Sequence, residues 1–250
     1  MKYRQATLTG LITRCTKYKE ADLIFTLISE EQGLTKFIAR GAKKPKSKFS
    51  GHIESLNYVN IYYKPSKGIN SVTQVESINS FLDLKKTYDL VIKAQYLMEL
   101  SEVLSMENEK NPFLMKALLG TLAQLSNSKI PDLHIGIFEF EILNYQGFGM
   151  NVFKCLNCRD PLLKLSHFFS STLGGFLCNK CLSENIDNGE LIKVSIQEQV
   201  ILRNIARKNY RALIENTFSD NDISSIRALL QKSIKDIMDV QLKTSKFQNN

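Results

Sequence analysis

Four of the five cysteines fall into two closely spaced pairs. Cys155 and Cys158 form the first CxxC pair, and Cys178 and Cys181 form the second pair after 19 intervening residues. A CxxC pair places two thiolates on one tight turn, from which both can reach the same cation at about 2.3 Å. Two such turns supply four soft ligands in a tetrahedron, the arrangement that Zn²⁺ prefers. The spacing therefore predicts one bound zinc ion with these four cysteines as its ligands.

A closed shell of four thiolates indicates a structural zinc ion rather than a catalytic one. A catalytic zinc keeps one coordination position open for water or substrate, and four protein ligands leave none. We expect the ion to cross-link residues 152–184, which are short of a core of their own. His167 lies between the two pairs. Because no fifth ligand is needed, we expect His167 on the surface of the β-ribbon that joins the pairs.

One short motif would make the chain an enzyme if it formed a site. His52-Ile53-Glu54 matches the HxE of the zinc nucleobase deaminases, whose zinc site is completed by a PCxxC motif. Here Lys154 precedes the first CxxC pair, and the second pair already completes the ligand shell. A GxxxxGK-S/T phosphate loop is absent from the sequence. We therefore predict no catalytic residue and no enzyme activity, and we interpret Cys15 as a partly buried small apolar residue.

The composition is that of a globular protein without a membrane anchor. Hydrophobic residues make up 43% of the chain and charged residues 23%, and there is no apolar run of 18 residues. The segment from Met1 to Gly10 has no apolar stretch long enough for a signal peptide. We therefore expect a cytoplasmic protein, in which paired cysteines indicate metal binding rather than disulfides.

Positive charge is concentrated in the first third of the chain. Residues 1–80 carry 13 Lys and Arg against 6 Asp and Glu, whereas residues 81–250 carry 20 against 19. Such an excess suits a polyanion, either nucleic acid or an anionic membrane surface, and the alternative is a solvated basic face without a partner. Within it, Arg40 to Lys48 holds five cationic side chains among nine residues. This segment has no aliphatic residue larger than Ala, so we expect a solvated loop.

The first 80 residues predict a small β-domain. Short β-branched or alternating runs, separated by turn signals, indicate strands. The expected strands are Thr7–Thr13, Asp22–Ser29, Leu34–Arg40, Leu56–Tyr63 and Asn70–Ile78. We interpret Gly10 as a bulge or bend in the first of them. Five short strands over this length fit a closed barrel, and the OB-fold is the commonest five-stranded one.

From about residue 81 the apolar period changes to 3.6, which predicts a helical domain over residues 81–250. Helices are expected over Tyr88–Leu104, from Pro112 through Leu122, from an Asp132 N-cap to Tyr145, from a Ser195–Glu198 capping box through Ala206, and from Asp222 to about Val240. The polar tail from Lys243 is expected to fray. The predicted fold class is therefore α+β, an OB barrel followed by a helical domain with the cysteine segment 152–184 inserted.

Several motifs and their order resemble the RecO family of bacterial recombination mediators. The strongest match runs from Glu20 to Ser47. The motifs that carry the resemblance are Lys19-Glu20-Ala21-Asp22, Glu31-Gln32-Gly33-Leu34 and Ala39-Arg40-Gly41-Ala42-Lys43-Lys44-Pro45-Lys46-Ser47. The order of β-domain, helices, cysteine pairs and closing helices extends the resemblance over essentially the whole chain. Many members lack some of the cysteines, whereas all four are present here, which favours a zinc-bearing member.

This resemblance implies a DNA-binding protein that hydrolyses no nucleotide. RecO-like proteins bind single- and double-stranded DNA and anneal complementary strands. With RecR they help RecA replace the single-strand-binding protein SSB on gapped DNA. The resemblance also implies a nucleoid-associated location and contact with the acidic C-terminal tail of SSB, for which we expect a basic-rimmed apolar groove in the helical body. The surface that meets RecR is not identified by the sequence.

The basic residues of the β-domain are the candidate DNA contacts. On an OB barrel, cationic side chains can follow the phosphates of a single strand. By period-2 counting, Lys36 and Arg40 share one face of the third strand, and Lys17 and Lys19 lie in the turn after the first strand. The candidate contacts are Lys17, Lys19, Lys36, Arg40, Lys43, Lys44, Lys46 and Lys48. The alternative function is that of an RNA- or ribosome-associated OB-fold protein with a zinc ribbon, which would be equally basic.

Overall fold

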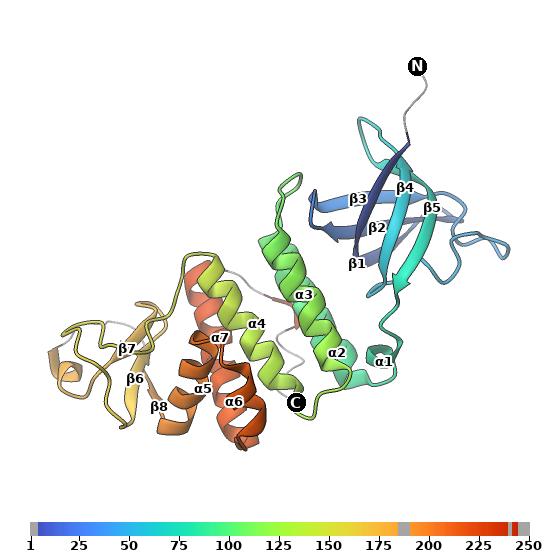
Figure 1. The fold of residues 1–250 in the computed structure, drawn as a ribbon. Coiled ribbons are helices and arrows are strands. Elements are labelled where there is room, and N and C mark those ends of the chain that lie inside the picture. Colours follow the sequence, from blue (N-terminus) through green and yellow to red (C-terminus); the bar gives the residue numbers. More distant parts are fainter. Residues whose placement is uncertain (1–4, 185–190, 240–241, 245–250) are drawn as a thin grey trace. The chain divides into compact units, whose positions relative to one another are not determined.

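The structure, a computed structural model, describes residues 5–184, 191–239 and 242–244 (Figure 1). The chain divides into two units. Met1–Ser128 and Leu242–Asn250 form the first unit, and Lys129–Gln241 form the second. The chain therefore leaves the first unit after residue 128 and returns to it after residue 241.

Among the described residues of the first unit, five strands close into a barrel. They are β1 (Ala6–Tyr18), β2 (Asp22–Ser29), β3 (Gly33–Ala39), β4 (Tyr58–Lys64) and β5 (Asn70–Asn79). Their order around the barrel is β1-β2-β3-β5-β4, and β1 also pairs with β4, which closes it. Neighbouring strands are antiparallel except for β3 and β5, which are parallel. This topology is that of an OB-fold, so the predicted fold class is confirmed.

Inward-facing apolar side chains fill the barrel. The rings of Phe25 and Phe37 stack at 5.6 Å between centroids, and Phe37 meets Tyr63 edge-on at 5.1 Å. The other interior strand positions are Leu8, Ile12, Leu27, Ala39, Val59, Ile61, Val72 and Val75. Full burial of one large apolar side chain contributes about 1.5–3 kcal/mol. The interior therefore gives the strands and their loops a firm support.

The first strand bends at a bulge, but not at the residue that the sequence suggested. The pairing of β1 with β4 runs unbroken through Gly10, and the pairing of β1 with β2 shifts between Ile12 and Arg14. The prediction of a bulge at Gly10 is therefore wrong. A Cβ atom at Gly10 would lie 2.4 Å from the carbonyl oxygen of Ile28. Glycine is required at this position because the two strands approach each other closely there.

Residues 40–57 close one end of the barrel. Ala42, Phe49 and Ile53 from this segment are buried in the barrel core. The prediction of a solvated loop over Arg40–Lys48 is therefore right for its five cations, which are all exposed, and wrong for Ala42. Buried side chains before and after the lysines hold the loop, so the cations extend from an anchored segment.

Three helices follow the barrel among the described residues of the first unit: α1 (Leu82–Lys85), α2 (Tyr88–Leu104) and α3 (Pro112–Leu125). The bounds of α2 are those predicted, and α3 begins at the predicted proline. The Asn111 side chain accepts a hydrogen bond from the first turn of α3 at 3.0 Å. On α2, Glu102 accepts hydrogen bonds from Thr13 and Arg14 of β1, both at 2.5 Å. These bonds join the helix to the barrel wall.

Residues 242–244 lie against α2. The Glu99 carboxylate accepts hydrogen bonds from the backbone N–H of Lys243 at 2.9 Å, from that of Thr244 at 2.9 Å, and from the Thr244 hydroxyl at 2.6 Å. The adjacent Leu242 is buried. The predicted fraying is therefore wrong for Lys243 and Thr244, and the rest of the predicted tail lies outside the described residues.

The described part of the second unit combines helices with a small antiparallel sheet. The helices are α4 (Pro131–Tyr145), α5 (Ile196–Ala206), α6 (Tyr210–Glu215) and α7 (Asp220–Met238), with a 3-10 turn, η1 (Cys181–Glu184). The strands β6 (His167–Ser170), β7 (Gly175–Leu177) and β8 (Leu191–Val194) pair in the order β7-β6-β8. The predicted Ser195–Glu198 capping box is present. The last helix begins two residues before the predicted Asp222, and its predicted end, Val240, lies outside the described residues.

A buried ion pair joins α4 to α7 and explains why Asp132 is not a helix cap. The N-cap residue of α4 is Ile130, and Asp132 lies in the first turn, so the predicted cap is wrong. Arg227 of α7 donates to the Asp132 carboxylate at 2.7 Å and to the Glu139 carboxylate at 2.9 Å. Arg227 and Glu139 are both buried. A buried guanidinium needs carboxylate partners to offset its desolvation, and Asp132 is one of the two partners of Arg227.

Candidate nucleic-acid interface and metal centre

The loop at Arg40–Lys48, called here the basic loop, lies against the β1–β2 turn. The Gly41 N–H donates to the Asp22 carboxylate at 2.8 Å, and the Lys43 N–H donates to the Ala21 carbonyl oxygen at 2.9 Å. Gly41 has a φ of 69°, which glycine adopts without strain. These two bonds bring the cations of both segments to the same edge of the barrel.

All eight candidate DNA contacts are exposed. They are Lys17, Lys19, Lys36, Arg40, Lys43, Lys44, Lys46 and Lys48. One position differs from the prediction, because Lys17 is still part of β1 and pairs with Leu23 of β2. Lys19 lies in the turn, with its Nζ atom 5.7 Å from the centre of the exposed Tyr18 ring. Within the described residues none of the eight forms an ion pair with a carboxylate, so their charge is not neutralised from within.

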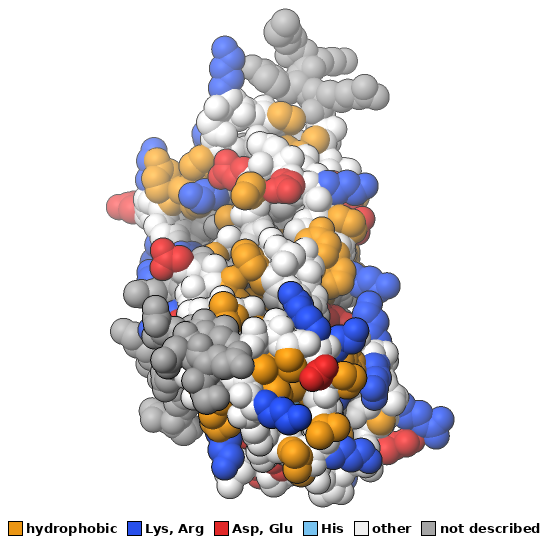
Figure 2. All heavy atoms as spheres, turned by 90° about the vertical axis from the view of Figure 1, so that its left-hand side faces the viewer, with side chains coloured by type: hydrophobic (Ala, Val, Ile, Leu, Met, Phe, Trp, Pro, Cys, Tyr) orange, Lys and Arg blue, Asp and Glu red, His pale blue; other side chains and the backbone are white. Residues whose placement is uncertain are grey.

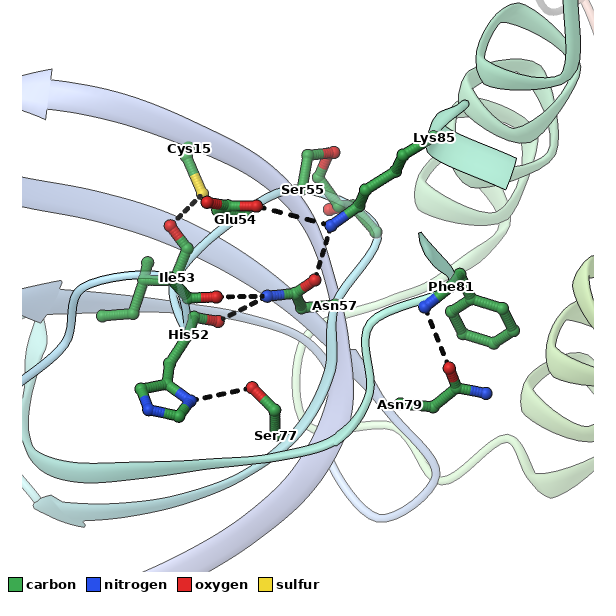
Figure 3. A network of polar contacts seen from close by, with 12 residues as sticks. Cys15, His52, Ile53, Glu54, Ser55, Asn57, Ser77, Asn79, Phe81 and Lys85 are labelled. Atoms are coloured by element: carbon green, nitrogen blue, oxygen red, sulfur yellow. Dashed lines mark hydrogen bonds and ion pairs between the residues drawn. The ribbon is translucent and has the colours of Figure 1, made fainter. Parts of the chain in front are cut away.

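A polar network holds the closed end of the barrel (Figure 3). The buried Asn57 amide donates to the carbonyl oxygens of Gly51 and His52, at 3.1 and 2.9 Å. The same side chain accepts a hydrogen bond from Lys85 of α1 at 2.6 Å, and Lys85 also pairs with Glu54 at 3.5 Å. The segment that follows the basic loop is therefore tied both to itself and to the first helix.

The HxE motif belongs to this network rather than to a metal site. His52 Nδ1 lies 2.9 Å from the Ser77 hydroxyl, and Glu54 pairs with Lys85 (Figure 3). Within the described ranges, the four paired cysteines are the one group of side chains that could hold a metal ion. Cys15 is partly buried, as predicted. Burial and then the charge of Glu54 raise the pKa of Cys15 to about 11, which keeps it an unreactive thiol at neutral pH.

The four cysteines converge in the second unit. The Sγ atoms of Cys155, Cys158, Cys178 and Cys181 all lie within 4.8 Å of one another, and those of Cys158 and Cys178 are 3.8 Å apart. Four sulfur atoms at about 2.3 Å from a zinc ion would be about 3.8 Å apart in a tetrahedron. The donor set and its spacing therefore fit a tetrahedral thiolate site, and the cluster could hold a metal ion.

The acidities of the four thiols are unequal. Burial raises the pKa of Cys155. Hydrogen bonds from the N–H groups of Cys178, Cys158 and Asn157 outweigh this effect and lower the pKa from 9.0 to about 7. At Cys158 the Asp160 N–H lowers the pKa, but burial and the neighbouring thiols outweigh it and raise the pKa to about 12. Several adjacent thiolates repel one another, whereas a divalent cation favours the ionised form of each. Metal binding should therefore release protons from this cluster.

Two tight turns and a β-ribbon place the thiols. The Arg159 N–H donates to the Cys155 carbonyl oxygen at 3.1 Å, and the Cys181 N–H donates to that of Cys178 at 3.0 Å. These bonds close the two turns. Between them, β6 pairs with β7, and the rings of Phe169 and Phe176 meet edge-on at 5.4 Å. The ribbon returns the chain so that the second turn faces the first.

Packing between the first turn and the ribbon leaves no room for a side chain at Gly175. A Cβ atom there would lie 2.9 Å from the Leu156 side chain, and the Leu156 N–H donates to the Phe176 carbonyl oxygen at 2.8 Å.

His167 is buried, and its Nε2 atom lies 3.0 Å from the Leu163 carbonyl oxygen. The prediction of a surface position for His167 is therefore wrong, because the loop before β6 folds over it.

The sequence analysis missed the side chains that hold residues 152–184, called here the cysteine module, on α5. Gln199 donates to a carbonyl oxygen in the loop before β6 at 2.8 Å, and Arg203 donates to the Val152 carbonyl oxygen at 3.1 Å. The Arg207 guanidinium lies 5.0 Å from the centre of the Phe153 ring. Gln199 and Arg203 of α5 and its C-cap residue Arg207 are spaced by four and share one face of the helix. Their spacing was visible in the sequence, but it does not reveal their partners.

Known protein families cover nearly the whole chain. The family model described as "Recombination protein O N terminal" matches residues 1–81, and the one described as "Recombination protein O C terminal" matches residues 86–246. The chain belongs to the recombination protein O (RecO) family. The boundary between the two RecO matches falls after the barrel, within the short helix α1.

Curated relatives carry the same family name. The DNA repair protein RecO of Dehalococcoides mccartyi is 30% identical over 234 residues, which is 94% of this chain and 91% of the relative. The RecO proteins of Halalkalibacterium halodurans and Acetivibrio thermocellus are 24% and 28% identical, over 95% and 91% of this chain and 92% and 90% of their own. The predicted resemblance is confirmed, and RecO membership makes this a protein of DNA repair and recombination.

The names of these families and relatives do not state a catalytic activity. None of the helices in the described ranges is long and apolar enough to cross a membrane.

Proposed function

We propose that this RecO-family protein is a recombination mediator that binds single- and double-stranded DNA and anneals complementary strands. Residues 1–80 would be the DNA-binding domain, and residues 81–250 the helical domain with its cysteine module. With RecR, the protein would help load RecA onto gapped DNA coated with SSB, in the bacterial cytoplasm at the nucleoid. The observation that carries the proposal is the set of exposed cations where the basic loop meets the β1–β2 turn.

These cations would act on the phosphate backbone. Each Lys or Arg that neutralises a phosphate releases condensed counterions, so binding should weaken steeply as salt rises. Lys36 and Arg40 are exposed on and just after β3, and the lysines of the basic loop continue the run. Phosphate contacts carry no sequence information. We therefore expect little sequence preference, as annealing requires.

Annealing would follow from the same charges. Two complementary strands repel each other through their phosphates, and a cationic surface that holds both lowers this repulsion and raises their local concentration. No covalent bond is made or broken in this process. The proposal therefore needs neither a catalytic residue nor nucleotide hydrolysis.

We propose one structural zinc ion bound by Cys155, Cys158, Cys178 and Cys181. The separations between their sulfur atoms support this proposal, since they suit Zn–S bonds of about 2.3 Å. When bound, zinc would supply a rigid cross-link between the two turns. Four thiolates leave no position for a reacting water, so the chain's own residues do no chemistry there.

A groove in the second unit is the proposed docking site for the acidic tail of SSB. It lies between β8 and α7 and has a volume of about 270 Å³. Ile192, Ile226 and Leu229 contribute its apolar lining. Lys193 and Lys232 contribute cations, although Lys232 also pairs with Asp236 at 3.4 Å and Glu198 contributes a carboxylate. Complementary charge supports an acidic segment with apolar residues as the occupant. Replacing both lysines with Glu should weaken the binding of a peptide copy of that tail.

The decisive experiment measures annealing of complementary DNA, naked or coated with SSB, with and without RecR, over a range of salt. Reversing Lys43, Lys44 and Lys46 to Glu should abolish DNA retention and annealing without lowering thermal stability, since these side chains are exposed. Unchanged annealing would refute the role of the barrel. Preference for structured RNA, without annealing of SSB-coated DNA, would favour the RNA- or ribosome-associated alternative.

A further inference from the structure

Cations also gather on the second unit, where the cysteine module meets the end of α5. The cations are Lys154, Arg203, Arg207 and Lys208, and the aromatic residue Phe153 lies with them. Phe153 is 38% exposed, and the Arg207 guanidinium lies 5.0 Å from the centre of its ring. Arg207 is exposed, and so are Lys154, which follows Phe153 in the chain, and Lys208, which follows Arg207. Figure 2 shows that Lys and Arg side chains and exposed hydrophobic side chains lie interspersed on the face that it displays.

These cations are not neutralised by the protein as far as the structure describes it. Lys154, Arg207 and Lys208 have no ion pair with a carboxylate of the described residues. Arg203 donates only to neutral acceptors, the Val152 carbonyl oxygen at 3.1 Å and the Gln199 side chain at 3.0 Å. Burial and then the charge of Arg207 lower the pKa of Arg203. Like charges held together in this way favour a bound anion.

Hydrogen bonds hold the backbone of the segment that carries the Phe153 ring. The Asn151 carboxamide accepts a hydrogen bond from the Phe153 N–H at 3.3 Å, and the Phe153 carbonyl oxygen accepts one from the Leu162 N–H at 3.0 Å. On α5, the contacts of Arg203 with Val152 hold the same segment. The backbone that carries the ring is therefore fixed before a ligand binds, which lowers the ordering cost of binding.

We propose that Phe153, Lys154, Arg207 and Lys208 form a second contact site for single-stranded nucleic acid. An exposed ring accepts a base by stacking, and cations beside it neutralise the adjacent phosphates, which is the combination that binds single strands without sequence preference. This inference rests on the proposed annealing function and deepens it. An annealing protein must hold two strands, and this site would take the second while the barrel holds the first.

The test uses the full-length, zinc-loaded protein and oligothymidine, which cannot pair with itself. One strand is immobilised, the protein is bound to it, and capture of a second, fluorescent strand is measured. Binding of a single free strand is followed separately by fluorescence anisotropy. The variants are Arg207→Gln with Lys208→Gln, and Phe153→Leu. The matched control is Arg211→Gln with Lys235→Gln, which removes two exposed charges of the same unit on α6 and α7.

Phe153→Leu should reduce capture of the second strand about tenfold, the scale of one lost base stack. The Arg207 and Lys208 variant should also reduce it, through the loss of two phosphate contacts, whereas the control should not. First-strand binding should persist in all three, because the barrel is untouched. An oligonucleotide that contains iododeoxyuridine should photo-crosslink to Phe153, and Phe153→Leu should lose this crosslink. Undiminished capture by the Arg207 and Lys208 variant, or crosslinks confined to the barrel, would overturn the proposal. Equal competition by a polyglutamate peptide would also overturn it, in favour of an acidic protein segment.

The barrel variant Lys43→Glu, Lys44→Glu, Lys46→Glu separates this inference from the proposed function. If that variant binds a single strand much more weakly but keeps the Phe153 crosslink, both proposals are supported. If it keeps first-strand binding while the crosslink persists, the barrel proposal fails and the second site stands. If it loses both the binding and the crosslink, the second site has no affinity of its own and the inference fails.

Discussion

The basic loop of the barrel and the cysteine module are suited to charged partners in opposite ways. In the loop, exposed lysines act through a summed field that reaches over a Debye length of about 10 Å, so no single position is decisive. In the module, four sulfur atoms within 4.8 Å of one another must face one point. Loss of one sulfur opens the ligand shell. We therefore expect graded loss of function in the first region and all-or-none loss in the second.

Replacing Cys181 with Ser should have the largest effect. Structural zinc sites contribute about 10–16 kcal/mol of apparent binding free energy, and three thiolates cannot complete the shell. We expect bound zinc, measured by mass spectrometry, to fall from about one equivalent to almost none, and the thermal stability of the second unit to fall markedly. Cys15→Ser is the matched control and should keep its zinc. A full equivalent of zinc in Cys181→Ser would contradict the four-thiol site.

Reversing Lys43, Lys44 and Lys46 to Glu should lower single-strand affinity more than about 100-fold at low salt. The slope of log affinity against log salt should fall by about 2, since each phosphate contact on a single strand contributes about 0.7. Fluorescence anisotropy across a salt series measures both.

Single reversals sharpen the same comparison. Lys43→Glu alone should lose only part of the affinity, because its neighbours remain. The control is Lys64→Glu with Lys67→Glu. Lys64 ends β4 and Lys67 lies in the following loop, both outside the basic loop and the β1–β2 turn, so this pair should lose less affinity than the triple variant. Complete loss of binding in a single lysine variant would argue against a summed field.

Replacing Asn57 with Ala should destabilise the first unit by about 1–3 kcal/mol, because the carbonyl oxygens of Gly51 and His52 and the Lys85 ammonium would lose their buried partner. Chemical denaturation followed by circular dichroism measures this, and zinc content should be unchanged. Asn60→Ala, which loses one partly buried hydrogen bond, is the control. Equal stability of the two variants would show that the network of Figure 3 does not support the barrel end.

Acid should release Leu242–Thr244 from α2 with a small effect on stability. Burial raises the pKa of Glu99, but hydrogen bonds from Thr244 and Lys243 outweigh it and lower the pKa below its ordinary 4.5. A group with a lowered folded pKa stabilises the protein above its unfolded pKa, and this contribution is lost as pH falls through the folded value. The effect should stay below about 1 kcal/mol, since solvent screens the carboxylate.

The anisotropy of a fluorophore at the C-terminus reports this release. It should fall as the solution is acidified below the usual carboxyl range, and Glu99→Gln should lose the acid-dependent step. An identical acid transition in wild type and Glu99→Gln would assign the release to another group.

Local patterns predicted much of the fold and of the candidate metal site. The bounds of α2, the start of α3 and the Ser195–Glu198 capping box depend on residues three or four positions apart, and they appear as expected. The errors arose where a distant group intervened. Asp132 pairs with Arg227 instead of capping a helix, and Gly10 admits a neighbouring strand instead of forming a bulge.

The sequence by itself determined the four-thiol donor set, the strand and helix pattern and the excess of charge at one end of the chain. Each of these depends on residue types and short spacings. Only the tertiary structure decided that Asp22 holds the basic loop, that α5 holds the cysteine module, and that Glu99 holds residues 242–244. The physical reason is that a side chain's distant partner is chosen by the packing of whole elements, which sums many weak contacts that no local pattern records.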